Sequence, residues 1–253
     1  TTLGASVGAG KFNGSNITDV ITSTGTDVDA SRQLKWTLDS PTLQAYDFSP
    51  ATPKLTMGSA VSSIAADDNF TISAWVYMDA IDERPLFGLN AETDDHWIQF
   101  TNATVMGFKG TGAAVSLTHG LTISTGSWQH VVIARASSNT VTVYLNGIAG
   151  GTTLEWNEAF APDAIGTSNN GTRQYFDGRI AQVAIWDDVA LPEAQIRSIY
   201  IQGLSFDIRT NADDALTNLE TGLVHYWVLN GGVSDSKGSN HLTASSDCTA
   251  TGI

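Results

Sequence analysis

The sequence predicts an all-β fold, a two-sheet antiparallel sandwich of jelly-roll type with one short helix near residues 191–202. Three observations support this prediction. Short stretches of alternating apolar and polar residues recur along most of the chain, and a period of two is typical of strands. Gly, Asn, Asp, Ser and Thr separate these stretches, as expected for tight turns. Only one segment shows helical spacing, and many short strands with a single helix favour a sandwich.

Residues 70–78 are the clearest strand. The even positions from Phe70 to Met78 are all apolar and would face one side. The alternate positions would face the other side, and they include Trp75 and Tyr77. Further strands are expected where the same alternation recurs, at residues 97–100, 104–108, 129–135, 140–145, 148–152, 178–186 and 223–229.

The stretch 126–147 contains a histidine close to a tryptophan, which raises the question of an active site. Trp128 and His130 begin a strand, and Asn146-Gly147 is a turn that reverses the chain after the next strand. In an alternating strand His130 shares a side with Val132. We therefore predict that His130 is a hydrogen-bonded structural residue and not a catalytic base.

Residues 191–202 carry the helical pattern. Pro192 suits the first turn, and the charge of Glu193 is favourable beside the N-terminal end of the helix dipole. The apolar residues that follow recur at helical spacing as far as Tyr200, and Gly203 supplies a stop.

No sharp linker divides the chain, so we expect one domain with extensions. Residues 1–45 would form a polar N-terminal extension that packs on or beside the sandwich. Residues 46–203 would form the sandwich itself. Residues 204–253 would form a C-terminal extension with at least one strand, in the same domain.

The composition excludes several classes of partner. Acidic residues outnumber basic residues 26 to 12, and a net charge of −14 repels phosphate backbones, so we expect no nucleic-acid partner. No apolar run approaches the roughly 18 residues that a membrane helix needs, so we expect no membrane insertion. The single cysteine, Cys248, excludes an internal disulfide.

From residue 46 to residue 203, the order of the elements resembles the laminin G-like, concanavalin A-like sandwich family. The resemblance rests on a series of short segments, at residues 46–48, 70–76, 126–132, 143–147, 165–166, 175–178, 180–186 and 190–196. It implies two antiparallel sheets of about six or seven strands each, one of them concave.

A second resemblance comes from the C-terminal part. The segment 222–229 with the following Asp235 comes after the helix, an order similar to that in laminin G-like proteins encoded by marine bacteriophages. This implies a structural or decorating component of a virus particle, at the virion surface or extracellular. Its partners would be other structural proteins of the particle or surface glycans. A homo-oligomer is left open.

Two alternatives are kept. The first is an extracellular lectin-like carbohydrate-binding module, with or without calcium. The second is a glycoside-cleaving enzyme, for which related glucanases carry Glu-x-Asp-x-x-Glu on one strand so that the carboxylates share one face. The nearest match, residues 92–97, lacks the final Glu and precedes a strand. We therefore predict that the protein is not an enzyme and name no catalytic residue.

Calcium is the metal that the resemblance suggests. Pentraxins, which are similar sandwiches, bind calcium through an acidic pair before one strand and an acidic cluster after a later Leu/Ile-Gly. The corresponding positions here are Asp94 and Asp95, and then Asn169 and Asn170 after Gly166. Asn offers neutral carbonyl oxygens where carboxylates would supply charge, so the resemblance implies a weak calcium site or none.

For a glycan, aromatic side chains would stack on the sugar rings. The predicted contacts have polar sequence neighbours or occupy the less aliphatic face of a strand, and they are Trp97, Trp156, Tyr77 and Tyr144. Trp75 and Trp128 are expected to be core residues.

Overall fold

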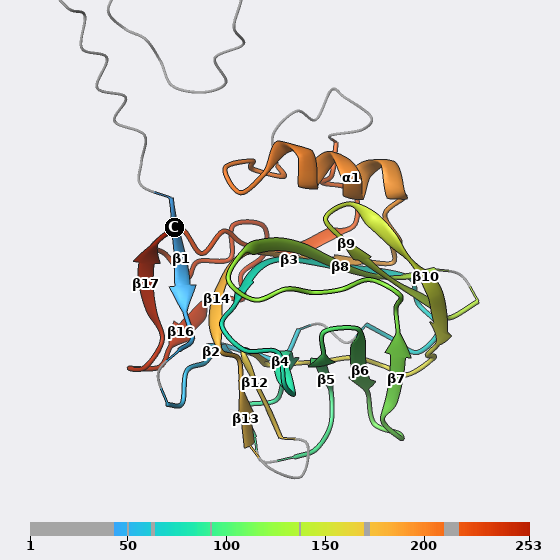
Figure 1. Cartoon of the computed structure of the whole chain (residues 1–253), viewed down its shortest axis with the longest axis horizontal. Coiled ribbons are helices and arrows are strands. Elements are labelled where there is room, and N and C mark those ends of the chain that lie inside the picture. The colour runs from blue at the N-terminus through green and yellow to red at the C-terminus, as the bar shows by residue number, and fades with distance from the viewer. Residues whose placement is uncertain are drawn as a thin grey trace, which may run out of the picture. The chain divides into compact units, whose positions relative to one another are not determined.

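The alternating stretches form two antiparallel sheets that pack face to face (Figure 1). A computed structural model gives the structure and describes residues 43–49, 51–61, 64–91, 93–136, 138–169, 173–209 and 218–253. All of these residues lie within one unit, Ser40–Ile253. Most of the predicted N-terminal extension lies outside the described residues. The predicted all-β sandwich with one helix is confirmed.

The larger sheet contains eight strands. Seven of them follow one another in the order β10 (Ile148–Glu155), β9 (Thr140–Leu145), β8 (Trp128–Ala136), β3 (Phe70–Met78), β14 (Gly178–Asp187), β1 (Gln44–Asp47) and β17 (Thr249–Gly252). The eighth, β15 (Leu223–Trp227), pairs with β14.

The smaller sheet contains seven strands. Their order is β16 (Leu242–Ala244), β2 (Leu55–Met57), β11 (Ala164–Ile165), β4 (Arg84–Gly88), β5 (Trp97–Asn102), β6 (Val105–Lys109) and β7 (Val115–Thr118). A separate hairpin consists of β12 (Thr167–Asn169) and β13 (Arg173–Tyr175), and β12 lies against β4.

The main core lies between the two sheets. The even-numbered residues of β3, from Phe70 to Met78, are fully buried in it, as the alternation predicted. On the facing sheet Ile98 and Phe100 of β5 are also fully buried in this cluster. The odd-numbered residues of β3 are therefore directed to the outer face of the larger sheet.

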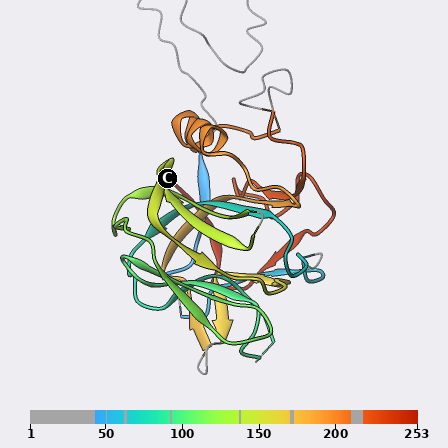
Figure 2. The same ribbon diagram turned by 90° about the vertical axis from the view of Figure 1, so that its right-hand side faces the viewer.

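The predicted helix is α1 (Glu193–Gln202), which packs on the outer face of the larger sheet (Figures 1 and 2). Pro192 precedes its first residue, and the Pro192 carbonyl accepts hydrogen bonds from the N–H groups of Gln195 and Ile196. Gly203 ends the helix with a φ of 74°, a conformation that glycine adopts without a steric penalty.

Residues 204–253 contribute strands to both sheets. β17 pairs with β1 and β15 with β14 in the larger sheet, whereas β16 pairs with β2 in the smaller one. Within the described part of the chain, no helix is long and apolar enough to cross a membrane.

Candidate functional site

Helix α1 covers only part of the outer face of the larger sheet. Under the helix, Val132 of β8 and the β14 residues Ala184 and Trp186 form a buried apolar cluster with Ile196 and Ile199. The rest of this face carries aromatic side chains that are enclosed only in part. This uncovered part is the candidate site.

The aromatic shelf, as we call it, consists of Trp75, Tyr77, Trp128 and Arg179. Strand register places Tyr77 of β3 opposite Trp128 of β8 and opposite Arg179 of β14. The ring centroids of Tyr77 and Trp128 are 5.9 Å apart with an interplanar angle of 64°, and Arg179 Cζ lies 4.0 Å from the Tyr77 centroid. Tyr77, Trp128 and Arg179 are half-buried, so mutual contacts fix the rings while part of each stays exposed.

Two small residues pack against Trp75 of the shelf. Ala45 and Ala181 pack with Trp75, and Trp128 and Leu204 lie at the margin of the same cluster. Ala45 and Ala181 are at most 1 % exposed, so they form a close-packed base under the Trp75 ring.

Trp75 is the most enclosed residue of the shelf, with 6 % of its surface exposed. Its ring stacks on Tyr200 of α1, with centroids 6.0 Å apart and an interplanar angle of 25°. Among the described residues, the indole Nε1 of Trp75 has no hydrogen-bond acceptor. A buried donor without an acceptor costs about 1–3 kcal/mol, so the shelf is not optimised for stability alone.

His130 lies beside Trp75 and closes the inner edge of the shelf. It is fully buried, its ring centroid is 5.1 Å from that of Trp75, and its Nε2 is hydrogen-bonded to Ser73 Oγ at 2.8 Å. Burial lowers the pKa of His130 to about 3, so the ring is neutral near neutral pH. The prediction that His130 is a hydrogen-bonded structural residue is confirmed.

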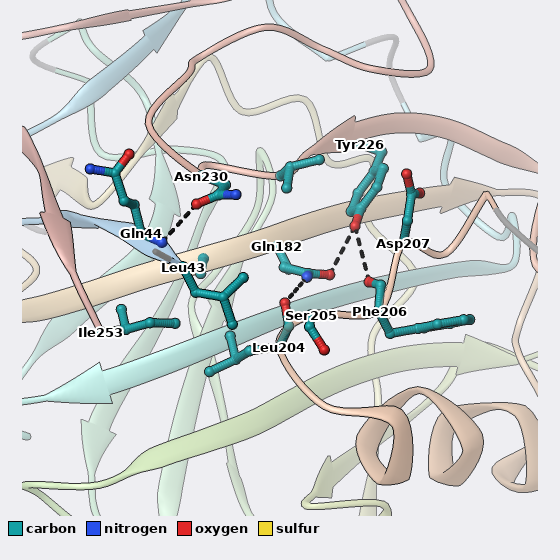
Figure 3. Close-up of a pocket in the computed structure, with 12 residues that line it drawn as sticks. Leu43, Gln44, Gln182, Leu204, Ser205, Phe206, Asp207, Tyr226, Asn230 and Ile253 are labelled. Carbon is teal, nitrogen blue, oxygen red and sulfur yellow. Dashed lines mark hydrogen bonds between the residues drawn. The ribbon is translucent and has the colours of Figure 1, made fainter. Parts of the chain in front are cut away.

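A small pocket continues the shelf along β14 (Figure 3). We call it the amide pocket because Gln44, Gln182 and Asn230 line it, together with the Tyr226 hydroxyl. Its volume is about 70 Å³, which admits water-sized groups and no complete sugar ring. Ala181 and Leu204 belong both to its lining and to the Trp75 cluster, so the pocket and the shelf are contiguous.

The polar groups of the amide pocket are held in fixed positions (Figure 3). The Tyr226 hydroxyl donates to Gln182 Oε1 at 2.8 Å, and Gln182 Nε2 donates to the Leu204 carbonyl. The Gln44 N–H donates to Asn230 Oδ1 at 2.7 Å. Gln182 has a φ of 50° at an irregularity of β14, and a bulge of this kind redirects a side chain.

Comparison with known families identifies the fold family. A laminin G-type model of the concanavalin A-like lectin/glucanases superfamily matches residues 49–197, more than half of the chain. The chain belongs to this family. No curated protein matches the sequence of this laminin G-type domain.

Solved structures give the same architecture. A Bacteroides ovatus protein, described as a candidate carbohydrate binding protein, aligns with a TM-score of 0.60 and 18 % identity, over 83 % of this chain and 60 % of that one. The chain thus spans only part of the Bacteroides protein. The native heptameric SAP-like pentraxin of Limulus polyphemus aligns with a TM-score of 0.54 and 14 % identity, over 84 % of this chain and 95 % of that one. At such identities these likenesses concern the fold alone.

Two of the predicted glycan contacts lie on the outer face of the larger sheet. Tyr77 is part of the shelf. Tyr144 of β9 instead packs, half-buried, against the cluster under α1. Burial, and then the negative charge of Glu193, raise the pKa of Tyr144.

The other two predicted contacts are buried, so the prediction that they meet a ligand is wrong. Trp97 is 3 % exposed, and its Nε1 donates to Asp94 Oδ1 at 2.7 Å. Trp156 is 2 % exposed and lies in the main core against Phe70 and Phe108. Their polar sequence neighbours were misleading, because in an extended chain adjacent residues point to opposite sides.

The residues suggested for calcium are not assembled into an evident metal centre. Asp94 accepts from Trp97 through one carboxylate oxygen and from Lys109 Nζ, at 2.7 Å, through the other. Asn169 ends β12, and Asn170 lies outside the described residues. No group of three or more His, Cys, Asp or Glu that could hold a metal occurs in the described part of the chain.

Sequence reasoning missed most of the shelf and the amide pocket. Trp128 was expected in the core but is half-buried on the outer face, whereas Trp75 is buried as expected. The alanines at positions 45 and 181 were a usable signal, because small residues on an outward strand face let a large ring pack closely against the sheet. No pattern in the sequence predicted the bulge at Gln182.

Proposed function

We propose that this laminin G-type domain is a non-catalytic carbohydrate-binding module that binds a glycan chain along the aromatic shelf. The observation that carries the proposal is the cross-strand row of Trp128, Tyr77 and Arg179. Two partly exposed rings of fixed orientation lie next to a pocket of amide groups.

The chemistry of the two surfaces suits a sugar. One face of a pyranose ring presents C–H groups that pack on aromatic rings, and its hydroxyls both donate and accept hydrogen bonds. Tyr77 and Trp128 supply the aromatic part. Gln44 and Asn230 supply amide groups, which also donate and accept. The description of the Bacteroides ovatus protein of similar fold supports this proposal.

The carboxylate in the lining of the amide pocket supports a non-catalytic role. Asp207 accepts from Arg209 Nη2 at 2.6 Å and from Arg209 Nε at 3.0 Å. Burial would raise the pKa of Asp207, but these hydrogen bonds outweigh burial and lower it. An ionised Asp207 cannot donate a proton to a glycosidic oxygen, and a glycosidase needs such an acid opposite a second carboxylate.

The test is affinity electrophoresis of the full chain through gels that contain neutral plant, fungal or algal polysaccharides. The wild-type protein should be retarded by at least one of them. Trp128→Ala and Tyr77→Ala should each weaken this binding by roughly tenfold, about 1.4 kcal/mol, through lost stacking area.

Ile148→Ala is the matched control, because Ile148 is 61 % exposed on β10, away from the shelf. It should leave retardation unchanged. Shelf variants that bind as well as the wild type would exclude the shelf as the binding site. Release of shortened polysaccharide chains would exclude a non-catalytic role.

A further inference from the structure

A second hollow lies at the end of the sandwich, between the loop after β1, the β3–β4 loop and the segment that leads into β14. We call it the end pocket, and its lining consists of Phe48, Ser49, Ala51, Asp82, Glu83, Arg84, Gln174, Tyr175, Phe176 and Asp177. Its volume is about 460 Å³, within the range of roughly 300–1,000 Å³ that is typical of small-molecule sites. It is therefore large enough for a ligand that the amide pocket cannot hold.

The floor of the end pocket is apolar and rigid. Phe48 and Phe176 are each 1 % exposed, with ring centroids 5.8 Å apart in an edge-to-face arrangement. The Phe176 N–H donates to the Gly166 carbonyl at 2.8 Å, and the Phe48 ring lies directly against Gly166. Gly166 has a φ of 77°, and any Cβ there would collide with that ring.

The walls are polar, and hydrogen bonds connect them across the pocket. Gln174 Nε2 donates to Glu83 Oε2 at 2.6 Å, and Arg84 Nη1 donates to the Tyr175 carbonyl at 3.3 Å. Arg84 Nη2 also lies 3.6 Å from Asp177 Oδ2. These contacts hold the two walls at a fixed separation before any ligand arrives, which lowers the entropic cost of binding.

Several polar groups of the walls retain unused hydrogen-bonding capacity. The Arg84 and Asp177 side chains keep 30 % and 32 % of their surface exposed, so a ligand in the pocket can reach them. Asp82 is exposed at the rim and makes no hydrogen bond with a described residue. The walls thus offer a guanidinium donor and carboxylate acceptors, which suit the hydroxyls of a sugar ring.

The negative charge of the end pocket favours a neutral ligand over an anionic one. The lining contains the carboxylates of Asp82, Glu83 and Asp177 against the single guanidinium of Arg84. The chain as a whole carries a net charge of −14, which also repels anions. This negative charge would repel the carboxylate of an acidic sugar, whereas a neutral sugar carries no charge to be repelled.

We propose that the end pocket binds one neutral sugar residue at the end of the glycan, an inference that rests on the proposed carbohydrate-binding function. The position of the pocket supports this. Asp177 of its lining is two residues, roughly 7 Å of strand, before Arg179 of the aromatic shelf. A chain that lies along the shelf can therefore reach the pocket with its terminal residue.

The test is a titration of the isotope-labelled full chain, followed by NMR, with neutral methyl hexopyranosides of glucose, galactose and mannose. At least one of them should shift the backbone amides of residues 82–84 and 174–177 in a saturable manner. The methyl glucuronide matches the glucoside except for its carboxylate, and we expect it to bind at least roughly fivefold more weakly, because of the charge of the lining.

Variants then connect the shifts to the walls of the pocket. Asp82→Asn and Gln174→Ala should each weaken binding of the shifting hexopyranoside by roughly fivefold to tenfold, because the first weakens a charge-assisted hydrogen bond and the second releases Glu83 from the opposite wall. Asp188→Asn is the matched control, since Asp188 lies outside the pocket lining and an Asn tolerates its φ of 57°. Urea unfolding of each variant shows whether the fold is intact.

The outcomes separate this inference from the proposed function. If the polysaccharides bind through Trp128 and Tyr77 while no neutral hexopyranoside shifts residues 82–84, the inference is wrong and the function stands. If the glucuronide binds as tightly as the glucoside, the charge argument is wrong and the assignment to neutral sugars falls. If neither polysaccharides nor hexopyranosides bind, both proposals fail.

Discussion

The outer face of the larger sheet has two halves, one covered by α1 and one at the margin of α1 and beyond it. Under α1, Trp186 is fully buried, and its Nε1 donates to the Leu219 carbonyl at 2.7 Å. At the margin of α1, Trp75 stacks on Tyr200 but has no acceptor for its Nε1 among the described residues, and Trp128 remains half-buried. The strands β3, β8 and β14 pass through both halves.

This difference shows that the strand pattern does not decide whether an aromatic residue belongs to the core or to a site. Trp186 and Arg179 are both on β14, and Val132 and Trp128 are both on β8. The covering helix removes water from one half and supplies apolar partners there. The other half keeps aromatic area that is partly exposed, which is an interaction surface when it is contiguous.

The largest expected difference between the halves is in folding stability. Trp186→Ala should lower the free energy of unfolding by about 3–5 kcal/mol, because it leaves a cavity under α1. Trp128→Ala should cost less than about 1.5 kcal/mol, because its ring is partly exposed already. Equilibrium unfolding in urea measures both. Equal losses would show that the shelf is as much a part of the core as the covered half.

Much of this arrangement could be predicted from the sequence. Strand β3 has the predicted bounds and faces, and α1 follows Pro192 and ends before Gly203, as predicted. Local patterns determine such elements, since alternation and capping act within a few residues. The sequence also indicated correctly that Trp75 would be enclosed.

The ligand contacts were harder to predict because they depend on tertiary packing. The environment of Trp156 depends on Phe70 and Phe108, which are far from it in the sequence. The exposure of Trp128 depends on how far α1 extends across the sheet. The end pocket combines residues near positions 48, 83 and 175, which no local pattern connects.

The next prediction concerns the pH dependence of folding stability. It tests whether water reaches His130 at the inner edge of the shelf. The unfolded chain binds a proton on His130 near pH 6.5, and the folded chain binds it only near pH 3. The unfolded state therefore binds more protons in this window, and stability should fall by roughly 4–5 kcal/mol as the pH falls through it. In the folded state the ring contacts Ser73 and Trp75, both uncharged.

His130→Gln removes the titrating group from this position. Thermal unfolding of the variant should show a flatter pH dependence between about pH 6.5 and pH 3 than the wild type. Ile148→Ala, which leaves His130 in place, is the control and should keep the wild-type slope. An unchanged slope in His130→Gln would mean that water reaches His130 and that the shelf is open at this edge.

A smaller effect compares the two indole N–H groups directly. Trp186→Phe leaves the Leu219 carbonyl without its donor and should lower the free energy of unfolding by about 2 kcal/mol beyond the loss of ring area. Trp75→Phe removes a donor that has no acceptor, so the same change should cost less than about 1 kcal/mol. Urea unfolding of the pair measures the difference. Identical costs would show that an ordered water already satisfies Trp75.

The smallest expected effect concerns Arg179, whose side chain packs on the Tyr77 ring of the shelf. Arg179 lies over the Tyr77 ring and can be replaced by methionine, which keeps an apolar stem and removes the charge. The lost cation–π contact is worth about 0.5–1 kcal/mol, so polysaccharide binding should weaken roughly twofold to fivefold while unfolding changes little. The matched control is Arg197→Met on the exposed side of α1, which should have no effect on binding. Arg179 is also close in sequence to the end pocket, so this variant tests whether the two surfaces are independent. If they are, Arg179→Met should leave binding of a methyl hexopyranoside unchanged. Equal weakening for the hexopyranoside and the polysaccharide would mean that the two surfaces act as one site.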